Sequence, residues 1–97
     1  MLNRQPAVYI MTNKRNGTLY TGVTCDLIKR VYQHKEGVSD VFTKKYQCKQ
    51  RVYCEQLDEM IAAIAREKQI KAGSRKKKLT MIESVNPTWN DLYETLL

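Results

Sequence analysis

The sequence predicts an α+β fold, in which helices flank a small three-stranded antiparallel sheet. Two short β-prone runs near the N-terminus are separated by the turn-forming pair Asn16-Gly17, and a third such run covers residues 51–55. Two helical patterns with clear stops cover residues 24–36 and 58–72. Elements in the order strand, strand, helix, strand, helix, helix are typical of helices packed on an antiparallel sheet.

The first two strands, residues 8–11 and 19–23, are expected to form a β-hairpin. If the Asn-Gly pair forms a two-residue turn, Tyr20 lies opposite Asn13, whereas a longer or bulged loop changes this register. Tyr9 and Tyr20 point to the same face of the sheet in the two-residue register. Both hydroxyl groups can then serve one site.

The first helix is expected to begin after a polar cap, Thr24 or Asp26, and to end at Gly37. Its apolar side is expected to consist of Leu27, Ile28 and Val31. Arg30 and His34 are four residues apart, so they share one face of the helix beside that apolar side. Their polar ends can therefore emerge next to the sheet.

The second long helix is expected to cover residues 58–72 and to end at Gly73. Glu67 falls at the margin of its inner face, for which the expected residues are Met60, Ile61 and Ile64. A basic run follows at residues 75–78, and Asn86 then caps a terminal helix of about residues 86–97. Residues 39–49 are ambiguous, with one turn of helix around residues 42–46 as one interpretation.

Length and charge limit the class of protein. The 97 residues are enough for one domain, with a core expected at about residues 5–83. Seventeen Lys and Arg against ten Asp and Glu give a net charge of +7, which favours a polyanionic partner. No predicted helix combines a basic face with exposed aromatic residues, so nucleic acid is favoured over a membrane surface.

The sequence also indicates a soluble, cytoplasmic protein. No apolar segment approaches the roughly 20 residues of a spanning helix, and the first residues lack the apolar core of a signal peptide. Cys25, Cys48 and Cys54 form no CxxC pair, which favours reduced thiols over a disulfide framework. A zinc site built from these thiols and His34 matches no standard ligand spacing.

Five positions have the order and spacing of a known nuclease motif. The triplets Val8-Tyr9-Ile10 and Tyr20-Thr21-Gly22 precede Arg30, then His34 one helical turn later, and then Glu67. In this the chain resembles the GIY-YIG nuclease superfamily over nearly its whole length. Val8 and Thr21 depart from the name motif at positions that supply no catalytic atom. The tail is similar to that of a small stand-alone branch of uncharacterised, endonuclease-like proteins, through Asn86-Pro87, Trp89 and Asp91-Leu92.

The resemblance implies an endonuclease that hydrolyses DNA phosphodiester bonds and uses one Mg²⁺ or Mn²⁺ ion. It implies that Tyr9 accepts the proton of the attacking water or orients that water, while Tyr20 hydrogen-bonds water or phosphate. Arg30 is expected to bind phosphate oxygens with its planar fork. His34 is expected either to bind phosphate or to carry a proton, and Glu67 is expected to hold the metal.

Each of these residues also has an ordinary structural explanation. Tyr9 and Tyr20 fit half-buried strand positions, and Arg30 and His34 fit a solvated helix surface. Glu67 can simply pair with Lys71 one turn later. Three further acidic residues leave the metal ligand open on chemistry alone: Glu55, Asp58 and Glu59.

The expected contacts to nucleic acid are basic residues in four clusters: Lys14, Arg15, Lys29, Arg30, Lys44, Lys45, Arg75, Lys76, Lys77 and Lys78. No helix-turn-helix, zinc-finger or RNP-like element appears, so weakly specific or structure-selective binding is expected. Repair or recombination intermediates fit this expectation, with DNA favoured and RNA open. A protein partner could supply target specificity, and the oligomeric state is open. The other function class that fits is a non-catalytic, basic nucleic-acid-binding module.

Overall fold

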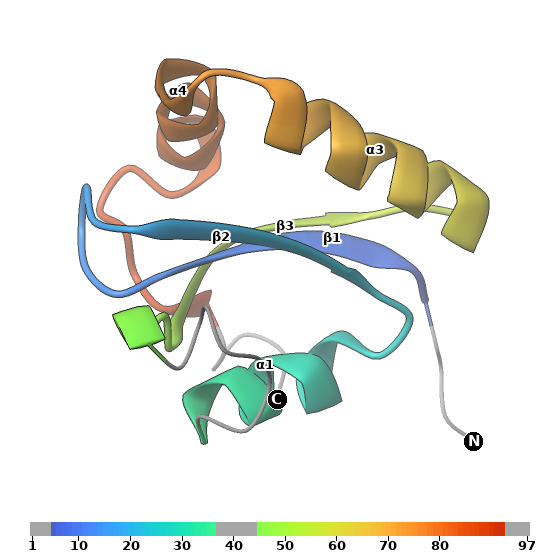
Figure 1. Cartoon of the computed structure of the whole chain (residues 1–97), viewed down its shortest axis with the longest axis horizontal. Coiled ribbons are helices and arrows are strands. Elements are labelled where there is room, and N and C mark those ends of the chain that lie inside the picture. Colours follow the sequence, from blue (N-terminus) through green and yellow to red (C-terminus); the bar gives the residue numbers. More distant parts are fainter. Residues whose placement is uncertain (1–4, 37–44, 93–97) are drawn as a thin grey trace.

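A computed structural model of the protein describes residues 5–36 and 45–92 (Figure 1). Three strands form one antiparallel sheet in the order β2-β1-β3. They are β1 at Ala7–Thr12, β2 at Leu19–Thr24 and β3 at Gln50–Gln56. The three-stranded antiparallel sheet expected from the sequence is confirmed, and its central strand is the N-terminal one.

Helices cover both faces of this sheet. Helix α1, Leu27–Lys35, lies against one face, while α3, Met60–Ala72, and α4, Arg75–Val85, lie against the other (Figure 1). The protein therefore has the predicted α+β fold. Among the described residues, no helix is long and apolar enough to cross a membrane.

The central strand supplies side chains to two buried clusters, because successive residues of a strand point to opposite faces. Val8 and Ile10 point toward α3 and α4, where the buried cluster also contains Val52, Ala63, Ile70, Ile82 and Trp89. Tyr9 points toward α1, where the cluster also contains Ala7, Met11, Leu27, Val31 and Cys48. All of β1 is buried, which explains why its sequence is a continuous apolar run rather than an alternating one.

The β1–β2 register differs from that of a two-residue turn. Tyr20 pairs with Met11 instead of Asn13, and Tyr9 pairs with Gly22. The strands are joined by a longer loop, residues 13–18, in which the Asn13 side chain accepts a hydrogen bond from the Thr18 amide at 3.0 Å. Because each pairing shifts by an even number of residues, the two tyrosines still share a face.

Helix α1 buries the expected Leu27 and Val31, whereas only Met60 of the three residues expected on the inner face of α3 packs against the core. In α1, Ile28 is exposed and His34 is buried with Leu27 and Val31. In α3, Ile61 is 79% exposed and Ile64 is also exposed. The side of α3 that meets the sheet carries Met60, Ala63, Glu67 and Ile70, at spacings of three and four residues. The small Ala63 allows close packing on the sheet, so the neighbouring isoleucines are turned outward.

The ends of these helices follow the sequence signals where the structure describes them. The Asp26 side chain caps α1 by accepting a hydrogen bond from the Lys29 amide at 3.4 Å. Helix α3 ends at Gly73, as expected. The expected stop at Gly37 and most of the ambiguous segment lie outside the described residues.

Residues 86–91 of the expected terminal helix are not helical. Among residues 86–92 the chain forms a turn in which Trp89 has a φ of 57°, and residues 93–97 lie outside the described part. The Asn86 side chain accepts a hydrogen bond from the Asn90 amide at 3.0 Å and donates to the Val52 carbonyl at 3.2 Å. Local bonding by the Asn86 side chain thus competes with helix formation.

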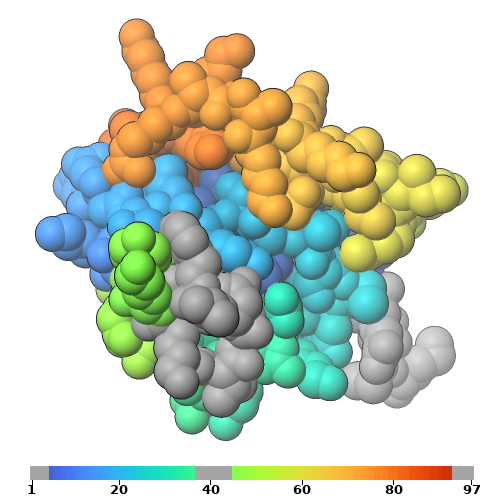
Figure 2. All heavy atoms as spheres, in the orientation of Figure 1, coloured from blue at the N-terminus to red at the C-terminus, as the bar shows by residue number. Residues whose placement is uncertain are grey.

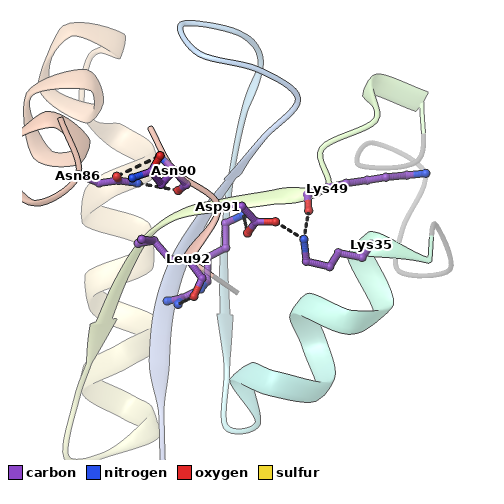
Figure 3. Close-up of polar contacts among 7 residues, drawn as sticks. Lys35, Lys49, Asn86, Asn90, Asp91 and Leu92 are labelled. Atoms are coloured by element: carbon purple, nitrogen blue, oxygen red, sulfur yellow. Dashed lines mark hydrogen bonds and ion pairs between the residues drawn. The ribbon is translucent and has the colours of Figure 1, made fainter. Parts of the chain in front are cut away.

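This segment ties the two faces of the sheet together. Trp89 belongs to the cluster under α3 and α4, whereas Asp91 forms an ion pair with Lys35 of α1 (Figure 3). Asp91 also accepts a hydrogen bond from the amide of Arg51 in β3 at 3.2 Å. The C-terminal segment therefore fixes α1 relative to the outer strand.

Candidate active site

Three of the sequence-predicted site residues meet on the α1 face of the sheet. The hydroxyl of Tyr9 lies 2.8 Å from Nε2 of His34. The ring of Tyr20 has its centroid 6.4 Å from that of Tyr9 and 5.2 Å from that of His34. Strands β1 and β2 and helix α1 each contribute one of these residues, so the tertiary fold creates the cluster.

Gly22 makes room for this cluster. It lies opposite Tyr9 in the β1–β2 ladder, and the Tyr9 ring lies across it. A Cβ atom at this position would be 2.4 Å from the Tyr9 hydroxyl and 3.0 Å from Cε1 of Tyr20. The glycine of the second triplet is therefore required by close approach. The sequence motif contained Gly22, but the residue acquires a role only once the register is known.

Arg30 completes the cluster from α1. The pKa of Arg30 is raised, chiefly by a side-chain hydrogen bond with Tyr9 and further by Tyr20, while partial burial lowers it. The Nη1 group also lies 3.4 Å from Oε1 of Gln33. The guanidinium is thus held beside both hydroxyl groups, as the shared face of Arg30 and His34 predicted.

The four residues form an inner and an outer layer. Tyr9 is fully buried and His34 is 1% exposed, whereas Tyr20 and Arg30 are half-buried. The outer pair can therefore contact a substrate directly. The inner pair is placed to hold or transfer a proton behind it.

Glu67 lies apart from this cluster, because α3 covers the opposite face of the sheet (Figure 1). Its side chain is 13% exposed and its Oε2 is 2.7 Å from Nζ of Lys71. This is the i, i+4 pair that the ordinary explanation of Glu67 predicted. Lys71 in turn lines a pocket together with Tyr20, so the Glu67–Lys71 ion pair lies near the edge strand β2, which carries one residue of the cluster.

The other acidic candidates are less suited to hold a metal with this cluster. Glu55 accepts hydrogen bonds from Nε of Arg66 at 2.8 Å and from the Tyr53 hydroxyl at 2.9 Å. Asp58 and Glu59 are exposed at the start of α3. No group of three or more His, Cys, Asp and Glu residues capable of holding a metal ion occurs within residues 5–36 and 45–92. No disulfide joins the three cysteines.

The half-buried carboxylate of Glu67 is nevertheless chemically suited to a hard divalent ion. Mg²⁺ in proteins commonly keeps several waters and is bound through one or two carboxylates together with substrate phosphates. Glu67 can supply the carboxylate once Lys71 releases it. Lys71 is 53% exposed at its side chain, so its ammonium group can turn toward solvent.

The basic residues expected to contact nucleic acid are distributed over several surfaces. Exposed positions are taken by Lys14, Arg15, Lys29, Lys45, Lys76 and Lys77, while Lys78 is half-buried. Arg75 is used structurally, because its Nη2 donates to the carbonyls of Asn16 and Gly17, both at 2.7 Å. Figure 2 shows orange side chains from around the α3–α4 junction projecting above the blue hairpin. Lys44 lies outside the described residues.

Comparison with known proteins gives one family. Residues 5–80 match the model of the GIY-YIG catalytic domain. A UPF0213 protein of Staphylococcus saprophyticus is 41% identical over 75 residues, which cover 77% of this chain and 90% of that protein. A UPF0213 protein of Staphylococcus haemolyticus is 40% identical over 76 residues, covering 78% of this chain and 92% of that protein. A third UPF0213 protein, from Haloquadratum walsbyi, is 38% identical over 66 residues, which cover 68% of this chain and 74% of that protein. No solved structure gives a significant match.

Proposed function

This chain belongs to the GIY-YIG family of catalytic nuclease domains, and we propose that it is an endonuclease that hydrolyses phosphodiester bonds of DNA. The reaction depends on one Mg²⁺ or Mn²⁺ ion. Branched repair or recombination intermediates are the proposed substrates, because the basic surface lacks a base-reading element. The proposed site consists of Tyr9, Tyr20, Arg30, His34 and Glu67.

The observation that carries this proposal is the buried hydrogen bond between Tyr9 and His34. Replacing both partners of a buried hydrogen bond by apolar groups of similar shape is often neutral or stabilising. Stability alone therefore does not require a tyrosine and a histidine here. A pair able to accept and pass a proton, with Arg30 and Tyr20 in front of it, meets the needs of phosphodiester hydrolysis.

In the proposed reaction the scissile phosphate lies against the outer layer, Tyr20 and Arg30. The guanidinium binds non-bridging phosphate oxygens, and the Tyr20 hydroxyl hydrogen-bonds the phosphate or the attacking water. As the water oxygen bonds to phosphorus, the ester P–O bond breaks and the leaving oxygen takes up a proton from solvent. Tyr9 accepts the water's proton while its own hydroxyl proton passes to Nε2 of His34, 2.8 Å away. The burial of His34 favours its sharing this proton with Tyr9 over its binding phosphate directly.

Glu67 is the proposed metal ligand, with water and substrate phosphate oxygens completing the coordination shell. When bound, the ion supplies positive charge for the pentacoordinate phosphorus and the leaving oxygen. Lys71 neutralises the carboxylate before the ion binds. Arg30 and Lys71 thus approach the substrate from the two faces of the sheet.

Cleavage assays with defined variants test the proposal. End-labelled plasmid, single-stranded and branched DNA, and parallel RNA, are incubated with Mg²⁺, Mn²⁺ or EDTA. Metal-dependent cutting is expected from the native protein and is expected to be lost in both Tyr9→Phe and Glu67→Ala. Tyr32→Phe and Glu59→Ala are matched controls, because Tyr32 on α1 and Glu59 at the start of α3 are exposed and lie outside the cluster.

Two outcomes contradict the proposal in different ways. Binding without cutting by native protein under every condition would support a non-catalytic binding module on this fold. If Glu67→Ala still cuts DNA and still requires a metal ion, a residue other than Glu67 must be the metal ligand.

A further inference from the structure

A pocket lies along the edge strand β2, on the side where α3 and α4 meet the sheet. It is lined by Leu19, Tyr20, Thr21, Lys71 and Lys78. Among the described residues no strand pairs with the outer edge of β2. In Figure 2 the pale-blue surface of the second strand is bordered by the yellow and orange surface of the last two helices. Extended chain can therefore pass along this edge.

We propose that this pocket is a second phosphate-binding subsite, which holds a nucleic-acid phosphate neighbouring the one at Tyr20 and Arg30. This inference rests on the proposed function. Tyr20 borders both the pocket and the tyrosine cluster. Two successive parts of one nucleic-acid strand can therefore lie on the two sides of Tyr20. Lys71 and Lys78 provide ammonium groups from two helices, which suits a phosphate lying between them.

Neighbouring basic residues serve other places on the surface. Arg75 is bound to the carbonyls of the hairpin loop. Lys77 and Lys78 both line another pocket, together with Arg66 and Gln69, but Lys78 also lines the pocket beside Tyr20. Within the basic run 75–78, Lys78 is thus the residue that lines the pocket beside Tyr20, where Lys71 of α3 joins it.

Glu67 couples this subsite to the proposed metal site. Its carboxylate is 2.7 Å from the Lys71 ammonium, so it competes with a phosphate for the same cation and repels the phosphate charge. Neutralising Glu67 releases Lys71 to the phosphate. A metal ion on the Glu67 carboxylate therefore strengthens binding of the nucleic-acid strand in the pocket. By the same coupling, a phosphate in the pocket strengthens binding of the metal ion.

Binding of fluorescently labelled DNA in EDTA tests the subsite without any cleavage. Anisotropy is measured against salt concentration for native protein, Lys71→Met, Lys78→Met and the control Lys68→Met. Lys68 is exposed on α3 and does not line the pocket. Each of the first two substitutions is expected to lower the magnitude of the log-log salt slope by about 0.7 on single strands and about 0.9 on duplex. Lys68→Met is expected to lower it by less than half as much.

A double-mutant comparison tests the coupling. In EDTA, Glu67→Gln is expected to tighten DNA binding roughly two- to fivefold, because the ammonium is released from a partly exposed ion pair. The same change in a Lys71→Met background is expected to have a clearly smaller effect. Normal folding of each variant is checked by its thermal unfolding temperature.

Two results would overturn the inference. Equal effects of all three lysine substitutions would mean that only general surface charge acts, and a loss of affinity in Glu67→Gln would contradict the release of Lys71. Because EDTA prevents metal-dependent cutting, these results are independent of catalysis. If native protein binds DNA as expected but never cuts it, the proposed nuclease function is contradicted and the phosphate-binding subsite is still supported.

Discussion

The Tyr9 hydroxyl and Nε2 of His34 lie 2.8 Å apart and join the central strand to α1. Both residues are buried, so the loss of either partner would leave the other's polar atom in an interior with little access to water. The Tyr20 ring packs against the same imidazole. One contact therefore sets both the position of α1 on the sheet and the geometry of the proposed site.

Replacing His34 separates these two roles. His34→Ala is expected to lower the free energy of unfolding by about 2–4 kcal/mol, from the cavity and the lost hydrogen bond. It is expected to reduce the cleavage rate by about 100-fold or more. His34→Gln retains an amide that can hydrogen-bond Tyr9, so it should recover stability more than activity. Urea denaturation measures the free energy of unfolding, and single-turnover cleavage measures the rate. A native cleavage rate in His34→Gln would argue against proton transfer by His34.

Gly22→Ala tests the close approach of the Tyr9 ring to β2. The added methyl group would lie 2.4 Å from the Tyr9 hydroxyl, so the ring must leave the position in which it bonds His34. Overpacking of this kind costs about 1–3 kcal/mol, and cleavage should fall with it. The matched control is Gly73→Ala, where the closest atom to a new Cβ would be the Ile70 carbonyl oxygen at 3.3 Å. Native cleavage by Gly22→Ala would show that the position of the Tyr9 ring is not critical.

The sequence was sufficient to predict the elements whose signals are local. The polar cap before α1, expected at Thr24 or Asp26, the stop at Gly73 and the three β-prone runs each depend on a few neighbouring residues. The β1–β2 register depends instead on how residues 13–18 close the loop, including the Asn13 side-chain bond to the Thr18 amide. A turn-forming pair alone could not specify that closure.

The buried face of α3 depends on the surface that the sheet offers. Apolar residues such as Ile61 and Ile64 mark one face by periodicity, but the sheet accepts the face that carries Ala63. That choice also determines the position of Glu67, which periodicity placed only at a margin. The meeting of Tyr9, Tyr20, Arg30 and His34 followed from the family resemblance, and their catalytic roles, like that of Glu67, stay predictions.

Arg30→Lys tests whether the proposed site needs a planar fork or only a positive charge. Lysine keeps the charge but cannot contact two phosphate oxygens and both tyrosine hydroxyls with one rigid group. Cleavage is expected to fall about 10- to 100-fold, while DNA binding in EDTA changes little. Arg30→Met should reduce both. Equal cleavage by the native and lysine proteins would reduce the role of Arg30 to general electrostatic attraction.

Asp91→Asn tests the contact by which the C-terminal segment holds α1 and β3 together (Figure 3). Burial lowers the pKa of Arg51, and the charge of Asp91 acts in the opposite direction. Removing that charge should lower the free energy of unfolding by about 1–3 kcal/mol. Urea denaturation near neutral pH measures the change. Asp58→Asn is the control at an exposed position before α3, and equal effects of the two variants would argue against a specific role for Asp91.

Alkaline pH is expected to destabilise the protein through Cys54, which pairs with Tyr9 in the β1–β3 ladder. Burial raises the pKa of the Cys54 thiol, and Arg51 only partly offsets this effect. The folded protein therefore holds the thiol proton more tightly than the unfolded chain does. The resulting stability is fully present below the pKa of the unfolded thiol, about 8.5–9, and is lost as the pH rises toward the folded value.

The free energy of unfolding, measured with urea and a reducing agent at about pH 7.5 and about pH 10, should therefore fall less in Cys54→Ala than in native protein. Some decline should persist, because burial also raises the pKa of Tyr53, with a smaller contribution from Glu55. Cys25→Ala is the matched control, since Cys25 is exposed, and it should retain the native decline. If Cys54→Ala declines as steeply as native protein, the alkaline loss must come from another group, of which Tyr53 is the first to test by Tyr53→Phe.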